Sequence, residues 1–234
     1  MINAACTLYG ENLWISPYVF SSFVALREKG IAFNLVELSL ADGQALQAPF
    51  RDHSITARVP SLEHEGFHLA ESSAIAEYLD EVFPAPTYPA LFPADRRERA
   101  RARQLMAWLR SDLAALRDDR STVTMFYRFK SQPLSPAAAR DTEKLVRVAE
   151  QLIPANGGPL FGAWCLVDSE LAFMLHRLIL NGDDVPARVR AYAAQQWSRP
   201  SVQEFVEHPR PATVPASYWA RSGTPQPESG LRPA

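Results

Sequence analysis

The segment from Phe83 to Pro93 constrains the fold of this chain more than any other feature. It holds four prolines in eleven residues. Proline lacks the backbone N–H that helices and sheets use, and it biases the preceding residue toward extended conformations. The segment therefore predicts an extended linker, here assigned to residues 85–94. The chain of 234 residues is long enough for a small domain on each side of it.

Strand and helix signals alternate before the linker. Ser16 and Pro17 form a typical start of a helix, because serine caps helix N-termini and proline is tolerated at the first helical position. Gly30 is expected to end that helix, and the Glu65–Gly66 pair predicts a tight turn between two strands. The sequence predicts strands at 5–9, 33–38, 60–64 and 67–69, a short helix within 41–50, and a last helix that includes Ile75 and Val82. This order predicts an α/β, thioredoxin-like domain over residues 1–84.

Strand signals are missing after the linker. Apolar residues form one stripe over a predicted long helix from about 95 to 119, and a second amphipathic helix is predicted over 136–153. The helix around 167–178 is apolar on nearly all sides, so it is expected to be central and buried. With shorter helices over 186–197 and 202–206, residues 95–208 are predicted to form an all-α helical bundle. Residues 209–234 are rich in proline and poor in large aliphatic residues, so this tail is expected to be disordered.

Composition and charge exclude several classes of protein. The net charge of −2 provides no basic field for nucleic acid or an anionic membrane. No apolar stretch of about 18 residues predicts a membrane span, and the first residues do not resemble a secretory signal. The only cysteines are Cys6 and Cys165, which fits a reducing compartment, and the five histidines lack metal-ligand spacing. We therefore expect a cytoplasmic protein without a metal.

Three motifs together resemble the glutathione transferase family. They are RVPSL at 58–62, LAESSAIAEYL at 69–79 and FGAWCLVDSELA at 161–172. Their order covers roughly residues 6 to 208, and the residues around Trp14 and Trp164 are most similar to the bacterial YfcF-type, serine-type members. The resemblance implies a glutathione-binding domain followed by a helical domain. It also implies a homodimeric detoxification enzyme whose co-substrate is glutathione.

The resemblance implies two anchors for glutathione. Val59–Pro60 would be a cis bond that presents the Val59 backbone to the cysteinyl part of glutathione as an added strand does, although a trans proline at a strand start is the alternative. Glu71 and Ser72 would hold the γ-glutamyl group at the N-terminus of the third helix, where free N–H groups favour a carboxylate. Simple capping of that helix by Ser72 is the alternative.

Ser16 is the predicted catalytic residue. Glutathione reacts as a thiolate, and a hydroxyl that donates a hydrogen bond to sulfur lowers the pKa of the thiol. Serine-type members of the family place this donor at the start of the first helix. Ser16 could instead only cap that helix, and the hydroxyls of Tyr9 and Tyr18 are the rival donors. Cys6 comes too early to be a catalytic cysteine and is expected to pack in the first strand.

The sequence departs from the family pattern in two places. The segment 50–60 lacks the usual proline and glycine before Val59, which leaves the glycyl end of glutathione without an assured site. Arg58 is the first candidate for that end, with Gln44 and His53 as weaker ones. Cys165 stands where the helical domain usually has serine or threonine, so Asp168 is expected to hold that helix start by bonding back to the N–H of Leu166 or Cys165.

The second substrate is left open by the sequence. Trp108, Phe126 and Tyr127 either line a pocket for a hydrophobic electrophile or belong to the core. The eight arginines between 96 and 120 are interleaved with acids and are expected to form a solvated face, although Arg103 or Arg110 could face the cleft. The same activated sulfur would serve transfer to an electrophile or reduction of a hydroperoxide. A non-catalytic module that binds glutathione or a partner is the alternative function.

Overall fold

The computed structural model describes residues 6–127, 132–216 and 218. These residues belong to two compact units. The first contains the chain up to Leu91 together with the segment from Gln203, and the second extends from Phe92 to Val202. The chain therefore passes between the units inside the proline-rich segment, and returns to the first unit near its C-terminal end.

The first unit contains a four-stranded mixed sheet with the order β2-β1-β3-β4. β1 is parallel to β2 and antiparallel to β3, and β4 is antiparallel to β3. This is the predicted thioredoxin-like arrangement. The strands are β1 (Cys6–Glu11), β2 (Phe33–Leu38), β3 (Ser61–His64) and β4 (Phe67–Ala70). The helices are α1 (Pro17–Glu28), the 3-10 helix η1 (Gln44–Leu46), α2 (Phe50–His53) and α3 (Ser72–Val82).

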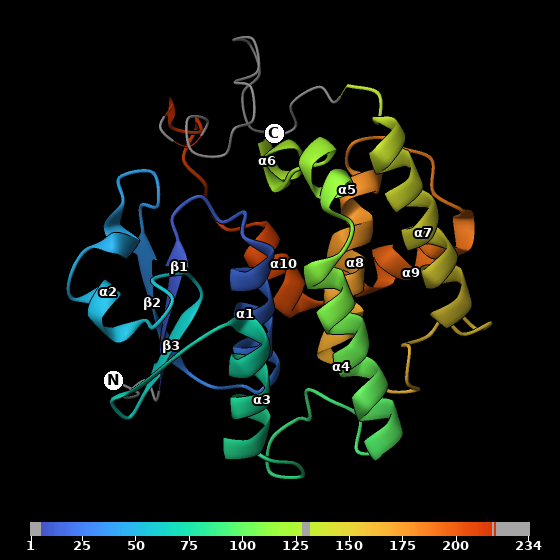
Figure 1. The fold of residues 1–234 in the computed structure, drawn as a ribbon. Coiled ribbons are helices and arrows are strands. Elements are labelled where there is room, and N and C mark those ends of the chain that lie inside the picture. The colour runs from blue at the N-terminus through green and yellow to red at the C-terminus, as the bar shows by residue number, and fades with distance from the viewer. Residues whose placement is uncertain (1–5, 128–131, 217, 219–234) are drawn as a thin grey trace. The chain divides into compact units, whose positions relative to one another are not determined.

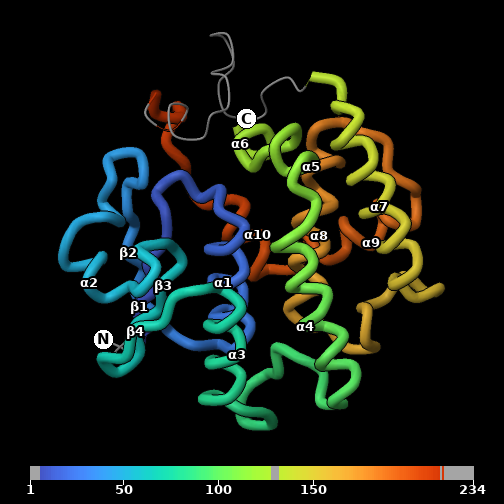
Figure 2. Tube along the Cα trace, viewed as in Figure 1, coloured from blue at the N-terminus to red at the C-terminus, as the bar shows by residue number. Residues whose placement is uncertain are grey.

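Helices cover the sheet from both sides. α1 and α3 lie side by side on one face, and α2 lies on the other (Figures 1 and 2). Leu8 on β1 and Ile75 on α3 are fully buried. At Gly10 a Cβ atom would lie 2.9 Å from Cγ1 of Val19, closer than real Cβ contacts come. Glycine at this position therefore allows α1 to approach β1.

The local signals in this unit formed the elements that they predict. Ser16 caps α1 with an extended backbone, and its Oγ accepts a hydrogen bond from the Val19 N–H. Gly30 adopts a φ of 68° just after the helix. In the turn between β3 and β4, Glu65 has a φ of 51° and Gly66 a φ of 80°. Glycine adopts these left-handed conformations at little cost.

A buried ion pair fastens the linker to the first unit. Nζ of Lys29 donates to Oδ1 of Asp80 and to the Phe83 carbonyl, both at 2.7 Å. The same Asp80 oxygen accepts from the Leu91 N–H at 2.8 Å. Leu91 is fully buried, so the linker is packed along its last residues rather than free.

The second unit is built from helices. Its members are α4 (Arg96–Ser111), α5 (Ala114–Asp119), α6 (Thr122–Tyr127), α7 (Pro136–Leu152), α8 (Leu166–Ile179), α9 (Ala187–Trp197) and the first residues of α10 (Pro200–Val206). α8 is buried over all of its residues except the last, as its apolar sequence predicts. The fold class, a thioredoxin-like domain followed by a helical bundle, is confirmed.

The prediction of one helix from 95 to 119 was wrong. α4 ends at Ser111 and α5 starts at Ala114, with Leu113 at a φ of 61° between them. The carboxylate of Asp112 accepts hydrogen bonds from the Leu113 N–H and from Nε1 of Trp108, both at 2.8 Å. This side chain replaces a helical partner of the backbone, so the apolar stripe continues while the helix is interrupted.

The predicted disordered tail is only partly covered by the structure. Residues 217 and 219–234 lie outside the described residues. Within the described part, Arg210 makes several hydrogen bonds and Val214 is buried. These first residues of the tail are therefore ordered against the first unit.

Candidate active site

The sheet register brings three chain connections to one edge of the sheet. Tyr9 of β1 pairs with Ser61 of β3, and Ser61 pairs with Ala70 of β4. The end of β1, the start of β3 and the end of β4 therefore meet at the same edge. The loop into α1, the Val59–Pro60 turn and the β4–α3 junction all leave from this edge.

Ser16 stands at the end of the loop that leads into α1. Its Oγ accepts from the Val19 N–H at 3.3 Å, and Pro17 occupies the first turn of the helix. A hydroxyl that accepts a hydrogen bond still has its own proton to donate. The Ser16 O–H is also placed at a helix N-terminus, where the positive end of the dipole favours a nearby anion.

Glu11 fixes the backbone of this loop through hydrogen bonds to its carboxylate. Its carboxylate accepts from the backbone N–H groups of Leu13 and Ile15 at 2.7 Å and of Ser16 at 2.8 Å. The side chain is only 5% exposed. Burial raises the pKa of Glu11, and these hydrogen bonds act in the opposite direction. A carboxylate at the end of β1 thus fixes the backbone up to Ser16, a role that the sequence did not reveal.

The Val59–Pro60 peptide bond is cis, as the family resemblance implies. Pro60 is buried and Val59 is partly exposed. The segment before it contains neither proline nor glycine, and Ser54 supplies its support: its Oγ donates to the Arg58 carbonyl at 3.3 Å. The Arg58 side chain is exposed.

Glu71 and Ser72 occupy the junction between β4 and α3. Glu71 has a φ of 72° and a ψ of 113° and is exposed, and its side chain makes no capping hydrogen bond. Ser72 is the first residue of the helix and is 4% exposed. The expectation that Ser72 is the cap of α3 was wrong, because Glu71 takes the cap position. A positive φ in a non-glycine residue costs on the order of 1–3 kcal/mol and tends to mark functional sites.

The rival donor Tyr9 lies on the other face of the sheet from α1. Its hydroxyl donates to Oε2 of Glu63 at 3.1 Å, and burial together with this neighbour raises the pKa of Tyr9. Side chains alternate along a strand, and the neighbouring Gly10 faces α1. Tyr9 therefore points away from the helix that Ser16 begins.

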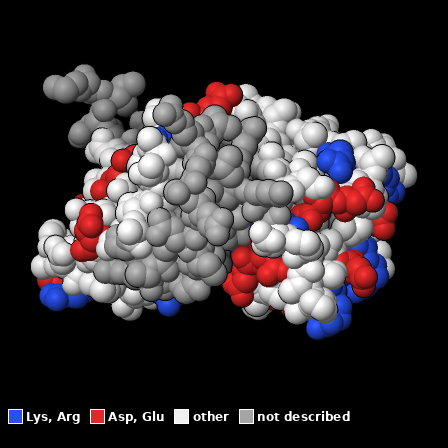
Figure 3. Space-filling model, turned by 90° about the horizontal axis from the view of Figure 1, so that it is seen from above, with Lys and Arg blue, Asp and Glu red and all other residues white. Residues whose placement is uncertain are grey.

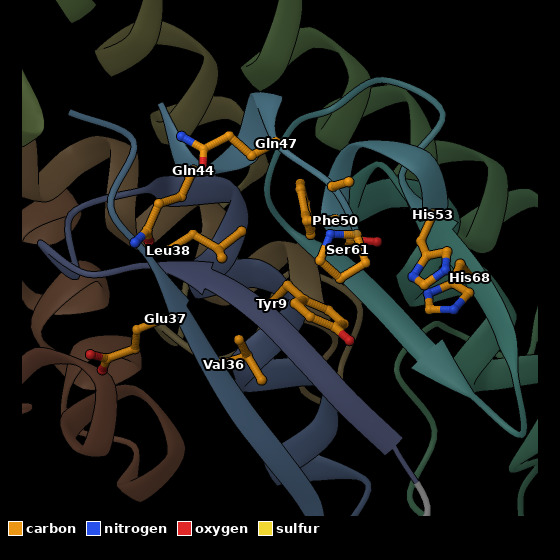
Figure 4. Close-up of a pocket in the computed structure, with 12 residues that line it drawn as sticks. Tyr9, Val36, Glu37, Leu38, Gln44, Gln47, Phe50, His53, Ser61 and His68 are labelled. Atoms are coloured by element: carbon orange, nitrogen blue, oxygen red, sulfur yellow. The ribbon is translucent and has the colours of Figure 1, made fainter. Parts of the chain in front are cut away.

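Tyr9 lines a pocket of about 400 Å³ between the sheet and the η1–α2 segment (Figure 4). The rings of His53 and His68 stack there with their centroids 4.3 Å apart. Besides Tyr9, the pocket contains Gln44 and His53, the weaker candidates for the glycyl end of glutathione. It contains none of the residues predicted to bind or activate glutathione, which are Ser16, Arg58, Val59, Pro60, Glu71 and Ser72. Its lining residues are Tyr9, Val36, Glu37, Leu38, Gln44, Gln47, Ala48, Pro49, Phe50, His53, Ser61 and His68.

The remaining nucleophile candidates are less suited. Cys6 is 2% exposed, and burial raises the pKa of its thiol to about 11, so it packs as a small apolar residue. Burial also raises the pKa of Cys165. Tyr18 is the second residue of α1 and is 38% exposed.

Asp168 organises the start of α8, as expected. Its carboxylate accepts from the N–H groups of Cys165 and Leu160 at 2.9 Å and from the Tyr192 hydroxyl at 2.7 Å. The bond to Cys165 is one of the two that the sequence suggested. In the same unit Arg110 is held by both carboxylate oxygens of Glu170 at 2.6 Å, so its charge is already paired.

The aromatic candidates for the electrophile pocket include core residues. Tyr127 is 1% exposed, and Trp108 is held by Asp112. Acidic and basic side chains are interspersed on the face shown in Figure 3. Across the part of the chain that the structure describes, no helix is long and apolar enough to span a bilayer. The same residues contain no cluster of three or more His, Cys, Asp or Glu suited to a metal ion.

Comparisons with known proteins agree with this geometry. Residues 15–82 match the model of the glutathione S-transferase N-terminal domain, and residues 95–209 match that of the C-terminal domain. A glutathione transferase homolog from Burkholderia, solved with bound glutathione, is 44% identical, with a TM-score of 0.72 over 86% of this chain and 96% of that one.

More distant relatives match over shorter stretches. Glutathione transferase GST 23 of Zea mays is 33% identical over 60% of this chain and 55% of its own length, and human glutathione S-transferase theta-1 is 32% identical over 56% and 54%. The matches thus span about half the length of these curated relatives. A theta class enzyme from Xanthomonas axonopodis pv. citri shares the fold at 24% identity, with a TM-score of 0.71 over 88% of this chain and 99% of that one. The chain belongs to the glutathione transferase family.

Proposed function

We propose that this protein is a cytoplasmic glutathione transferase of the serine type, similar to the YfcF-type members, in which Ser16 activates the thiol of glutathione. The observation that carries the proposal is the convergence of the Ser16 loop, the cis Val59–Pro60 turn and the β4–α3 junction at one sheet edge. The Burkholderia relative with bound glutathione supports it. Residues 1–84 form the glutathione-binding domain in this proposal, and residues 95–208 form the helical domain.

The chemistry follows from the thiol. A free cysteine thiol has a pKa of roughly 8.5, so most of it is protonated at neutral pH. A hydrogen bond from the Ser16 hydroxyl and the N-terminus of α1 both stabilise the thiolate and lower that pKa. The thiolate then attacks a hydrophobic electrophile and forms a C–S bond to it. In a peroxidase reaction it attacks an oxygen of a hydroperoxide instead, the O–O bond breaks to release the alcohol, and a second glutathione converts the resulting sulfenic acid to the disulfide and water.

The other predicted residues position the tripeptide. The Val59 backbone pairs with the cysteinyl unit beside Pro60, while Ser72 and the first N–H groups of α3 bind the γ-glutamyl carboxylate. Glu71 is exposed at the same junction and accepts from the γ-glutamyl ammonium. Arg58, exposed before the turn, pairs with the glycyl carboxylate.

The first experiment compares Ser16→Ala with a matched variant. Ser135 also precedes a proline and caps a helix, accepting from the Ala138 N–H at 3.2 Å. Ser135→Ala therefore loses the same kind of cap without touching the proposed site. Loss of a donor to a reacting anion costs about 10²–10³ in kcat. We expect a loss of this order only in Ser16→Ala, measured with a chromogenic electrophile and with an organic peroxide.

Two outcomes would change the proposal. Equal activity of Ser16→Ala and Ser135→Ala would remove the role of Ser16, and Tyr9→Phe would then be measured. Tight glutathione binding by calorimetry, with no turnover across a substrate panel, would favour a non-catalytic binding module.

We also propose that the protein is a homodimer in which the first domain of one subunit packs on the helical domain of the other. Ile55, in the loop before β3, is 97% exposed, so its side chain is available for contact with a second subunit. Light scattering should find a dimer that Ile55→Asp shifts toward monomer. Thr56→Asp places the same charge next to it and serves as the control. A monomeric wild type, or equal dissociation in both variants, would refute the assignment.

A further inference from the structure

The segment that begins at Gln203 packs against the loop that leads to Ser16. Phe205 in this segment is fully buried. Its ring lies 5.2 Å from that of Trp14 and 5.3 Å from that of Phe20, measured between centroids. Residues about 190 positions apart in the chain are therefore neighbours within the first unit.

Arg210 ties this segment to the backbone of the loop. Its Nε and Nη2 donate to the Trp14 carbonyl at 3.1 and 2.9 Å. Its other N–H groups donate to the carbonyls of Val206 at 2.6 Å, His208 at 3.0 Å and Phe205 at 3.1 Å. One guanidinium thus joins the last turn of α10 to a single carbonyl two residues before Ser16.

Trp14 is buried within this loop and has a left-handed backbone conformation. It has a φ of 53° and is 2% exposed. Its indole N–H donates to Oε1 of Glu37 at 2.6 Å, and its ring stacks on His208 with centroids 3.4 Å apart and planes at 15°. The left-handed backbone of a bulky residue persists only where its surroundings hold it. Glu37, His208 and Arg210 hold the ring and the carbonyl of Trp14.

Side chains therefore bind both the N–H groups and a carbonyl group of the loop backbone. Glu11 takes the N–H groups of Leu13, Ile15 and Ser16, and Arg210 takes the carbonyl of Trp14. We propose that Arg210 is a positioning residue for Ser16, which holds the loop so that the serine hydroxyl meets the glutathione sulfur. This inference rests on the proposed function of Ser16.

Loss of Arg210 should weaken the activation of the glutathione thiol by Ser16. Without Arg210 the carbonyl of Trp14 turns toward water and the loop relaxes, which moves the start of α1. A displaced donor stabilises the thiolate less, and a misplacement of about 1 Å can cost on the order of 10²-fold in rate. The anchors of the tripeptide lie on the other two connections of the sheet edge. The loss should therefore appear in kcat and in the pKa of the bound thiol, and KM for glutathione should change little.

The test uses the full-length protein with Arg210→Ala, Arg210→Lys and a matched control. Glu204→Gln is the control, because Glu204 belongs to the same segment and pairs with Arg27 at 2.5 Å on the surface, away from the loop. The ultraviolet absorbance of the thiolate gives the pKa of bound glutathione. We expect Arg210→Ala to raise that pKa by about one unit and to lower kcat roughly tenfold, Arg210→Lys to restore part of both, and Glu204→Gln to change neither.

A double variant separates positioning from general damage. If Arg210 acts through Ser16, then Arg210→Ala combined with Ser16→Ala should be no slower than Ser16→Ala alone. Additive losses, or an unchanged thiol pKa in Arg210→Ala, would overturn the inference.

Hydrogen exchange of residues 11–16 provides a readout that is independent of catalysis. Faster exchange in Arg210→Ala than in Glu204→Gln is expected even if Ser16 has no catalytic role. Equal exchange in the two variants refutes the positioning role, whereas the proposed function is decided by Ser16→Ala on its own.

Discussion

His176 makes the stability of the helical unit sensitive to acid. It lies on α8, is 5% exposed, and its ring stacks on Trp197 with centroids 4.0 Å apart. Nδ1 lies 2.8 Å from the Ala172 carbonyl, to which it donates. Burial lowers the pKa of His176 from 6.5 to about 4, and the bond to Ala172 opposes this only in part.

The sign and size of the effect follow from proton binding. Between pH 6.5 and 4 the unfolded chain binds a proton at this residue and the folded protein does not, so the free energy of unfolding falls as the pH falls. The pKa difference between 6.5 and about 4, at roughly 1.4 kcal/mol per pH unit, corresponds to about 3 kcal/mol. This stability is present above pH 6.5 and is lost progressively toward pH 4.

The assay is urea unfolding of wild type and His176→Phe at several pH values from 7.5 to about 4. Phenylalanine keeps a ring against Trp197 and leaves no polar group unpaired, because the Ala172 carbonyl retains its helical hydrogen bond. We expect the free energy of unfolding of wild type to fall by about 3 kcal/mol more than that of the variant over this range. Val189→Ala, a change in the buried face of α9, should lower stability at every pH without changing the slope. Parallel curves for wild type and His176→Phe would refute the reasoning.

Two further predictions, one for each unit, concern the free energy of unfolding, and each compares a pair of substitutions. Asp168→Ala should reduce the free energy of unfolding by about 3–5 kcal/mol, because it leaves the N–H groups of Cys165 and Leu160 and the Tyr192 hydroxyl without their acceptor. Tyr192→Phe should reduce it by only about 1 kcal/mol, and thermal or urea unfolding checks both values. Gly10→Ala should cost about 1–3 kcal/mol because its Cβ would meet Val19, and Val19→Ala in the same chain should recover part of the loss. A Gly10→Ala variant as stable as wild type would show that α1 can move away from β1.

Local sequence signals were enough to predict most of the fold. The Ser16–Pro17 pair, the Glu65–Gly66 turn and the apolar α8 act through neighbouring residues, and each formed the element that it predicts. The break between α4 and α5 was missed because it depends on which backbone group the Asp112 carboxylate takes. Apolar periodicity continues through that break and carries no information about it.

The candidate site also contains residues that short motifs predict and one residue that depends on a long-range contact. Val59–Pro60 and Glu71–Ser72 were predicted as site residues because they belong to short motifs, and the structure gives them a cis bond and a positive φ at one sheet edge. Arg210 could not be found, because the carbonyl that it holds lies 196 residues earlier in the chain. No sequence motif or spacing predicts a contact between residues so far apart in the chain.

The burial of Glu11 and Lys29 could not be predicted, because sequence analysis treats charged residues as surface groups, whereas the role of Asp168 at the start of α8 was expected. All three are buried, and each makes two or more hydrogen bonds at a connection between elements. An apolar substitute of similar size would leave the groups that these side chains bind without their hydrogen-bond partner. Substitution of these residues should therefore disturb the loop into α1, the linker and the start of α8, respectively. Only the first of these connections carries Ser16. Loss of charge at Glu11 should therefore change the pKa of the bound glutathione thiol, whereas loss of charge at Lys29 or Asp168 should change the free energy of unfolding alone.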